Sequence, residues 1–203
     1  MTRDKKSIET QQLITEQAFN VIYRHGYYRT TPGMIMKETR LSKGAFYHHF
    51  KNKSSLTEKM ISEILHQRIY QNMIRPLYEN EPTIELIEHV FTQRLRQFNE
   101  EEKLLGCPLN NLINELGYED NSLKKALKNI VIEWQNAIVY ILQIGIKEDQ
   151  IRDDIQPESI ATFLISSFEG IRGLRKLDKD DVFFKQYEES IKIVLQSIKK
   201  HSR

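Results

Sequence analysis

The sequence predicts an all-α protein of about nine helices, and three observations support that prediction. Apolar residues recur at steps of three and four along most of the chain, which is the spacing of a buried helix face. Five prolines and eight glycines fall mainly where such segments should begin or end. The alternation of Val, Ile and Thr that is typical of strands is absent. We therefore expect a small amino-terminal head of three helices and a larger helical body.

The three helices of the head are expected over about residues 7–25, 32–39 and 43–49. Gly26 is the expected stop of the first helix, because glycine tolerates the left-handed backbone that often follows a helix. Thr31 and Ser42 stand where the second and third helices need a capping side chain, and Pro32 occupies a first-turn position that needs no N–H. Two residues, 40 and 41, then form the turn between the second and third helices.

The body is expected to begin with a long fourth helix that Asn52 caps and Pro76 ends. Five further helices are expected over about residues 83–100, 108–116, 122–147, 157–176 and 181–200. We place the boundary between the two domains at residue 53, so that the head comprises residues 1–53 and the body comprises residues 54–203.

Charge is unevenly distributed between the head and the body. Residues 1–53 hold ten Lys or Arg and four Asp or Glu, whereas residues 54–203 hold twenty and twenty-four. The head therefore carries +6 and the body −4, within a net charge of +2. A basic head on an acidic body suits a polyanionic partner for the head alone. Small amino-terminal regions are also basic by chance, so charge is not sufficient evidence by itself.

Residues 31–50 have the layout of a helix-turn-helix, with two short helices joined by a tight turn. Ile35, Leu41, Phe46 and Phe50 are spaced to form a small core between the two helices. The other face of the second helix would then fit the major groove of double-stranded DNA. Lys43 would neutralise a phosphate or donate to guanine, and Ala45 would touch a thymine methyl group. The expected DNA contacts are Thr31, Gly33, Arg40, Ser42, Lys43, Gly44, Ala45, Tyr47, His48 and Lys53.

The segment SKGAFYHHFKNK, preceded by TTPGMIMKETRL, resembles the signature of the TetR/AcrR family of transcriptional regulators over about residues 8–56. The resemblance implies sequence-specific DNA binding, usually as a repressor, in the cytoplasm. This sequence departs from the family signature at three places, which affect the operator sequence it would recognise and not DNA binding as such. Pro32-Gly33 replaces a branched apolar and a polar residue, Arg40 replaces a common turn glycine, and Ala45 replaces a common threonine.

The last two helices carry apolar residues at alternating steps of four and three, which predicts a coiled-coil-like seam against a second copy of the chain. The resemblance supports a homodimer, because members of the family pair through their last two long helices. The alternative is that these residues pack against their own body. The expected seam comprises Ile160, Leu164, Ser167, Gly170, Ile171, Leu174, Phe184, Tyr187, Ile191, Val194 and Ile198.

Aromatic and aliphatic residues of the middle helices predict a cavity for a small-molecule effector, since such sites combine apolar walls with a few polar groups. The candidate contacts are Phe91, Leu95, Phe98, Asn110, Asn111, Asn114, Trp134, Ile138 and Glu169. The alternative is that the aromatic residues form an ordinary core. We expect an apolar or amphipathic effector, with a cationic group if Glu169 is buried.

Catalytic, cofactor and metal motifs are absent from the sequence: it has no phosphate-binding glycine loop, no nucleophile elbow and no His-x-x-x-His pair. The single cysteine, Cys107, excludes an internal disulfide and a cysteine-based zinc finger. A redox-sensing thiol is the alternative to a packed cysteine at this position. No apolar run is long enough to cross a membrane. We therefore expect a ligand-responsive DNA-binding regulator; a non-specific DNA-organising protein and a helical enzyme are the alternatives.

Overall fold

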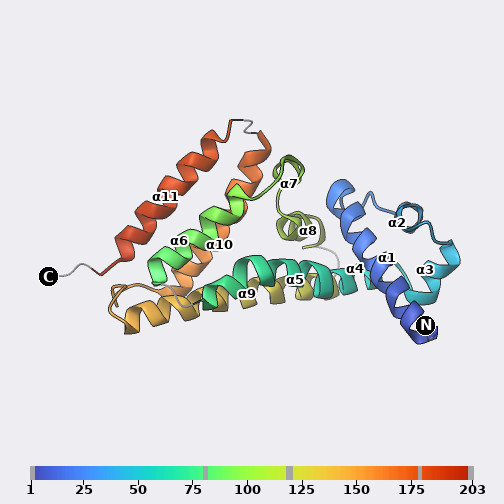
Figure 1. Ribbon diagram of the computed structural model, residues 1–203, viewed down its shortest axis with the longest axis horizontal. Coiled ribbons are helices and arrows are strands. Elements are labelled where there is room, and N and C mark those ends of the chain that lie inside the picture. The colour runs from blue at the N-terminus through green and yellow to red at the C-terminus, as the bar shows by residue number, and fades with distance from the viewer. Residues whose placement is uncertain (1–2, 80–81, 118–120, 178–179, 201–203) are drawn as a thin grey trace. The chain divides into compact units, whose positions relative to one another are not determined.

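The computed structural model describes residues 3–79, 82–117, 121–177 and 180–200, and within these ranges the backbone is almost entirely helical (Figure 1). The described residues form no β-strand, only one isolated bridge between Ile151 and Lys199. The all-α prediction is confirmed. The chain forms two compact units: unit 1 comprises residues up to 68 and residues 108–129, and unit 2 comprises residues 69–107 and those from 130 onward.

Unit 1 contains the predicted head. Its elements are α1 (Arg3–His25), α2 (Pro32–Thr39), α3 (Lys43–His49), α4 (Lys53–Met60) with its helical continuation to residue 68, α8 (Pro108–Leu116) and the first turns of α9 (Asn121–Lys147). Helix α1 packs against both α2 and α4 (Figure 1). Its buried face carries Ile14, Ala18 and Ile22, each at most 3% exposed, as the apolar spacing predicts.

The starts and stops of the head helices follow from local chemistry. The Thr31 hydroxyl accepts a hydrogen bond from Met34 N, and the Ser42 hydroxyl accepts one from Ala45 N, so each caps its helix. Asn52 caps α4 through a reciprocal pair with Ser55. Gly26 ends α1 at φ +83°, a conformation that a side chain disfavours. All four assignments had been made from the sequence.

The predicted fourth helix is helical throughout but not uniform. After α4, the chain passes through a π-helical turn (η1, Ile61–Leu65), α5 (His66–Ile69), a second π-helical turn (η2, Tyr70–Ile74) and a 3₁₀ turn (η3, Arg75–Tyr78). Pro76 has no N–H to donate to the turn before it, which accounts for the distortion at η2 and the end of the helix after η3. The sequence contains no comparable signal for η1.

Unit 2 holds α6 (Thr83–Arg96), α7 (Glu100–Leu105), the remainder of α9, α10 (Pro157–Leu174), the 3₁₀ turn η4 (Arg175–Leu177) and α11 (Val182–Ile198). Helix α11 packs against α6 and α10 (Figure 1). The predicted single helix over residues 83–100 is wrong, because it ends at Arg96 and α7 begins anew. Asn99 causes the break, since it caps α7 in a reciprocal pair with Glu102.

The compact unit that contains the head also includes residues 54–68 and 108–129. The division proposed from the sequence, at residue 53, separates DNA contact from effector binding and dimerisation instead. The two divisions describe different properties, and the functional one stays a prediction.

Candidate nucleic-acid interface and effector site

The helix-turn-helix is formed by α2, the turn at 40–42 and α3. Arg40 takes a left-handed conformation at φ +56°, where the family signature commonly has glycine. The Thr39 hydroxyl donates to Met36 O and accepts from Leu41 N, which fixes the turn from inside. Ile35, Phe46 and Phe50 are at most 4% exposed, so the small core expected between the helices is present, with Leu41 half-buried at its edge.

The face of α3 away from this core is open to solvent. Lys43, Gly44, Tyr47 and His48 are exposed, Tyr47 to 63%, and Ala45 is half-buried. The other expected DNA contacts before α3 are also exposed: Thr31, Gly33, Arg40 and Ser42. This arrangement places hydrogen-bond donors and small residues together on one short helix, which is the chemistry that a major groove accommodates. The individual DNA contacts remain predictions.

Lys53, also expected at DNA, has partners within unit 1. Its ammonium donates to Tyr27 O at 2.9 Å and to Thr30 O at 3.0 Å, and it lies 4.1 Å from the centre of the Tyr27 ring. Burial lowers the pKa of this ammonium, although the Glu115 carboxylate acts in the opposite direction. Lys53 thus holds the loop between α1 and α2, and a phosphate contact from it stays a prediction.

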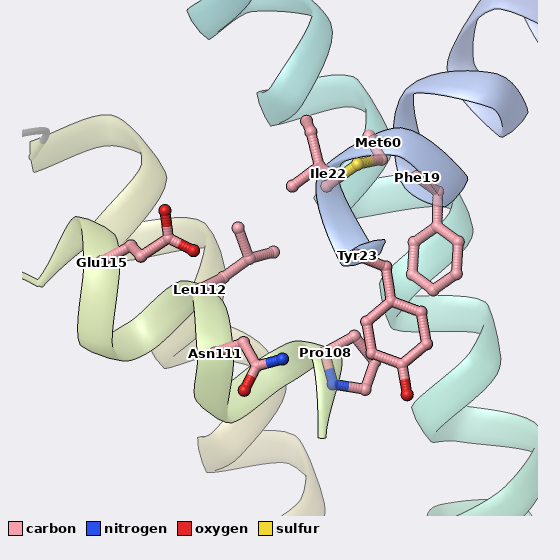
Figure 2. A pocket seen from close by; sticks show the side chains of 8 residues that line it. All are labelled: Phe19, Ile22, Tyr23, Met60, Pro108, Asn111, Leu112 and Glu115. Carbon is pink, nitrogen blue, oxygen red and sulfur yellow. The ribbon is translucent and has the colours of Figure 1, made fainter. Parts of the chain in front are cut away.

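Helix α8 is attached to the same loop. The Tyr28 N–H donates to Glu115 Oε2 at 3.2 Å, and the Glu115 carboxylate lies 3.0 Å from where a Cβ on Gly26 would stand. Beside this link is a niche with room for about one water molecule, which Phe19, Ile22, Tyr23, Met60, Pro108, Asn111, Leu112 and Glu115 line (Figure 2). Further along, the Ser122 hydroxyl donates to Glu58 Oε1 at 2.7 Å. Residues far along the chain therefore brace the head directly.

The expected effector residues of unit 2 lie in its core. Phe91, Leu95, Phe98, Trp134 and Ile138 are each at most 7% exposed. The Phe91 ring stacks on the Trp134 ring at 6.0 Å, and the Phe168 ring meets both edge-on, at 5.8 Å and 5.6 Å. We call Phe91, Trp134 and Phe168 the aromatic cluster.

The three asparagines expected beside these residues belong to a different unit. Asn110, Asn111 and Asn114 lie on α8 in unit 1, where Asn111 lines the niche of Figure 2 and Asn114 is exposed. An effector contact from these asparagines stays a prediction.

Two polar atoms in the interior of unit 2 have no hydrogen-bond partner among the described residues: Glu169 Oε2 and Trp134 Nε1. A third buried polar atom, Tyr187 OH, has only the Ser167 side chain beside it, too poorly aligned for a good hydrogen bond. The other Glu169 oxygen, Oε1, accepts from Cys107 Sγ at 3.1 Å. Burial raises the pKa of the Glu169 carboxyl, against the opposing effects of Cys107 and Arg172. Buried polar groups normally have partners, so unpartnered ones are candidate ligand contacts.

Two buried arginines, which the sequence analysis missed, organise the same interior. Arg172 donates from Nη2 to Gly106 O and lies 4.1 Å from the centre of the Phe98 ring. Arg175 donates to Leu95 O and to Asp181 Oδ1, the latter at 2.8 Å from Nη2. The signal was their register: both lie at steps of three and four after Phe168, where the buried stripe of α10 should continue.

The residues of the expected dimer seam differ in their exposure within one chain, and the seam itself stays a prediction. Six of its members are at most 7% exposed within one chain: Leu164, Ile171, Phe184, Tyr187, Ile191 and Ile198. Ile160, Ser167 and Val194 are half-buried, and Gly170 and Leu174 are exposed. The six buried residues form the protomer's own core, because steps of three and four describe any buried helix face. The exposed apolar residues of these helices and η4 are instead Phe163, Leu174, Leu177, Val182, Phe183 and Ile193.

Two family models match the chain. The model of bacterial regulatory proteins of the tetR family matches residues 14–60, and the model of the tetracyclin repressor-like C-terminal domain matches residues 84–191. The chain belongs to the TetR family. It is therefore a DNA-binding transcriptional regulator and not an enzyme, as the sequence analysis expected.

Relatives agree with this TetR-family assignment. The chain is 23% identical over 172 residues to the transcriptional repressor DhaR of Mycobacterium sp. (strain GP1), and the match covers 84% of each protein. A TetR-family regulator from Cytophaga hutchinsonii has the same fold, with a TM-score of 0.86, 21% identity and coverage of 97% of this chain and 98% of that one. A complex of SmeT with triclosan superposes with a TM-score of 0.72 at 19% identity, covering 96% and 93% of the two chains.

A metal site and a membrane-spanning helix are two further features to consider in the described part of the TetR-family chain. No group of three or more His, Cys, Asp or Glu side chains there is arranged to hold a metal ion. None of the described helices is both long and apolar enough to cross a bilayer.

Proposed function

We propose that the chain is a dimeric, sequence-specific repressor that a small apolar or amphipathic ligand releases from a palindromic operator. In this proposal residues 1–53 contact DNA and residues 54–203 bind the effector and the second copy. The relatives support repression and ligand response, since one is named a repressor and another is a complex with triclosan.

The open face of α3 is the observation that carries the proposal. Lys43, Tyr47 and His48 stand exposed beside Gly44, while Phe46 anchors the same helix in the core. A recognition helix needs this division between a packed face and a donor-rich face that can reach base edges and phosphates. A helix-turn-helix that served packing alone would have no need of the open donor-rich face.

A second copy would cover apolar side chains that one chain leaves exposed. We define the α10–α11 face as Phe163, Gly170, Leu174, Leu177, Phe183 and Ile193, which lie on the exposed side of α10, η4 and α11. Exposed apolar residues that gather into one patch are typical of association surfaces, and we propose that these residues form such a patch. A two-fold dimer presents two copies of α3 to successive major grooves, with half-site centres about 34–36 Å apart or a multiple of that.

Release from DNA requires that the effector favour a conformation in which the two heads no longer match the grooves. The helical segment from α4 to η3 is the proposed lever, because it leaves the head and enters unit 2. The hydrogen bond from Tyr28 N to Glu115 also attaches α8 to the head, in addition to the segment from α4 to η3. The proposed effector contacts remain those derived from the sequence, with the interior of unit 2 as their centre.

Selection of bound sequences from a random DNA library tests this function. We expect a near-palindrome whose half-sites have the spacing given above. A single asymmetric half-site would contradict the dimeric mode of binding. Recovery of no consensus, with binding that depends on salt but not on sequence, would instead support a non-specific DNA-organising protein.

A further inference from the structure

Glu169 places a carboxyl group in the interior of unit 2 with half of its hydrogen-bonding capacity unused. Its Oε1 accepts from the Cys107 thiol, whereas Oε2 is shut off from solvent and has no partner among the described residues. A thiol is a weak donor, so this single bond compensates poorly for removing a carboxylate from water.

The charged and titratable groups around Glu169 are Cys107, Arg172 and Tyr187, which come from the segment before α8, from α10 and from α11. Arg172 is committed elsewhere, to Gly106 O and to the face of Phe98, and no ion pair joins it to Glu169 among the described residues. Burial raises the pKa of the Tyr187 hydroxyl; a hydrogen bond with Ser167 opposes the rise, and the Glu169 charge adds to it. The Tyr187 hydroxyl is also buried, and apart from the Ser167 side chain it has no hydrogen-bond partner among the described residues, so its oxygen can still accept.

We propose, as an extension of the effector role above, that the ligand of this chain is a protonated amine on an apolar body, whose ammonium donates to Glu169 Oε2 and to the Tyr187 hydroxyl oxygen. Both atoms are acceptors, and an ammonium group has several N–H donors to offer them. The apolar body is expected in the interior of unit 2, where the aromatic cluster offers apolar surface and includes Phe168 of the same helix as Glu169. Trp134 Nε1 is a donor, which favours an acceptor atom elsewhere on the ligand.

The surroundings disfavour the other two charge classes. An anionic effector would meet the Glu169 carboxyl, while the two buried arginines already donate to backbone carbonyls and, for Arg175, to Asp181. A neutral alcohol can donate only one hydrogen bond, and hydrogen bonds between uncharged groups are weaker than those that involve a charge. An ammonium group differs from the alcohol in two favourable ways: it carries a positive charge opposite the carboxylate, and it has several N–H donors.

The proposal includes a pH dependence whose sign follows from Glu169. Burial raises the pKa of its carboxyl, so in the free protein this carboxyl keeps its proton to a higher pH than an exposed glutamate does. An ammonium ion stabilises the ionised form, and binding therefore releases that proton. Affinity for an amine should rise with pH through the pKa of Glu169 in the free protein, whereas affinity for a neutral ligand should not.

Three probes with one apolar body test the proposal: 4-phenylbutylamine, 4-phenylbutan-1-ol and 4-phenylbutyrate. Binding to the full chain is followed by calorimetry and by the fluorescence of Trp134, the single tryptophan. We expect the amine to bind at least tenfold more tightly than the alcohol and the carboxylate to bind most weakly. Equal affinity for amine and alcohol, or binding by none of the three, would overturn the proposal.

Substitutions test whether Glu169 and Tyr187 cause the preference for the amine. Glu169→Gln should abolish the preference for the amine and its pH dependence, and Tyr187→Phe should reduce the amine's affinity several-fold. Glu158→Gln, at an exposed carboxylate near the start of α10, is the matched control and should change neither. A Glu169→Gln chain that keeps the preference would contradict the assignment. If that variant does not fold, the pH dependence in the wild-type chain decides: an amine affinity that is flat with pH counts against Glu169.

The outcomes separate this inference from the proposed function. A chain that binds its selected operator but shows no preference for the amine retains its function as a regulator and loses only the effector class. A chain that prefers the amine but selects no operator retains the site and loses the proposed function.

Discussion

Arg40 combines an unfavourable backbone with a side chain that is expected at DNA. Its φ of +56° falls in the left-handed region that non-glycine residues occupy at a cost of roughly 1–2 kcal/mol. The cost persists because the turn must be tight enough to set α2 against α3. Retention of an arginine where glycine would be less strained is consistent with a role for the guanidinium outside the fold, on the DNA backbone.

Arg40→Gly should stabilise the protein by about 0.5–1 kcal/mol, because relief of the left-handed strain exceeds the entropy that glycine adds to the unfolded chain. Urea unfolding measures the change. The same variant should bind operator DNA more weakly. Arg40→Ala keeps the strain and removes the side chain, so it should lose DNA affinity without gaining stability. Equal stability of the two variants would show that the turn is not strained.

Lys43 and Tyr47 carry the most specific expectation for the open face of α3. Lys43→Ala should weaken operator binding and reduce the salt dependence by about one counterion per half-site, because one phosphate contact is lost. Tyr47→Phe should weaken binding through the loss of one hydroxyl donor, and both variants should keep the wild-type unfolding curve. Fluorescence anisotropy at several salt concentrations measures both effects. Lys124→Ala, at an exposed lysine of α9, is the control that should leave affinity unchanged.

The elements of the head were predicted well because their signals are local. Thr31, Ser42 and Asn52 cap helices within three residues of themselves, and Gly26 stops α1 through its own backbone. The signal for the break before α7 was also local, but the predicted helix over residues 83–100 included Asn99, and its role as a cap was missed. Such capping pairs can be found in a sequence by searching for them inside long apolar-periodic segments.

Contacts between distant elements were not predictable in the same way. The bond from Tyr28 N to Glu115 spans 87 positions, and the bond from Cys107 to Glu169 spans 62. No periodicity encodes such pairs. The dimer seam stays a prediction for a related reason. Periodicity finds the buried face of α10 and of α11, but it does not say whether the covering surface belongs to the same chain or to another.

A pair of glycine variants tests how α8 braces the head. Gly26→Ala should destabilise the protein by about 1–2 kcal/mol, because φ is +83° and the new methyl group would press on the Glu115 carboxylate. Gly33→Ala is the matched control in α2, where a methyl group meets only Thr31 Oγ1 at 3.7 Å. It should stabilise by about 0.5–1 kcal/mol, as alanine does inside helices. Thermal or urea unfolding compares the two, and equal effects would contradict the assignment of Gly26.

At the scale of the whole molecule, the proposed binding to a palindromic operator requires two copies of the chain. Ile193→Glu places a charge on the α10–α11 face, at a side chain 68% exposed in the single chain. The dissociation constant of the dimer should rise at least tenfold. A tenfold change corresponds to about 1.4 kcal/mol, and burying an unpaired charge costs more than that. Sedimentation equilibrium measures it. Leu104→Glu, on α7 and similarly exposed, should leave the dimer intact. Dissociation by both variants or by neither would place the interface elsewhere.

Sequence-specific binding through α3 is the central claim, and one measurement tests it most directly. Fluorescence anisotropy at a fixed salt concentration gives the Kd of the full chain for the selected operator and for a scrambled duplex of equal length and composition. We expect the operator to bind at least about 1,000-fold more tightly, the lower end of the range for specific regulators, and Lys43→Ala to lower that ratio. A ratio below about tenfold, unchanged by Lys43→Ala, would contradict the account.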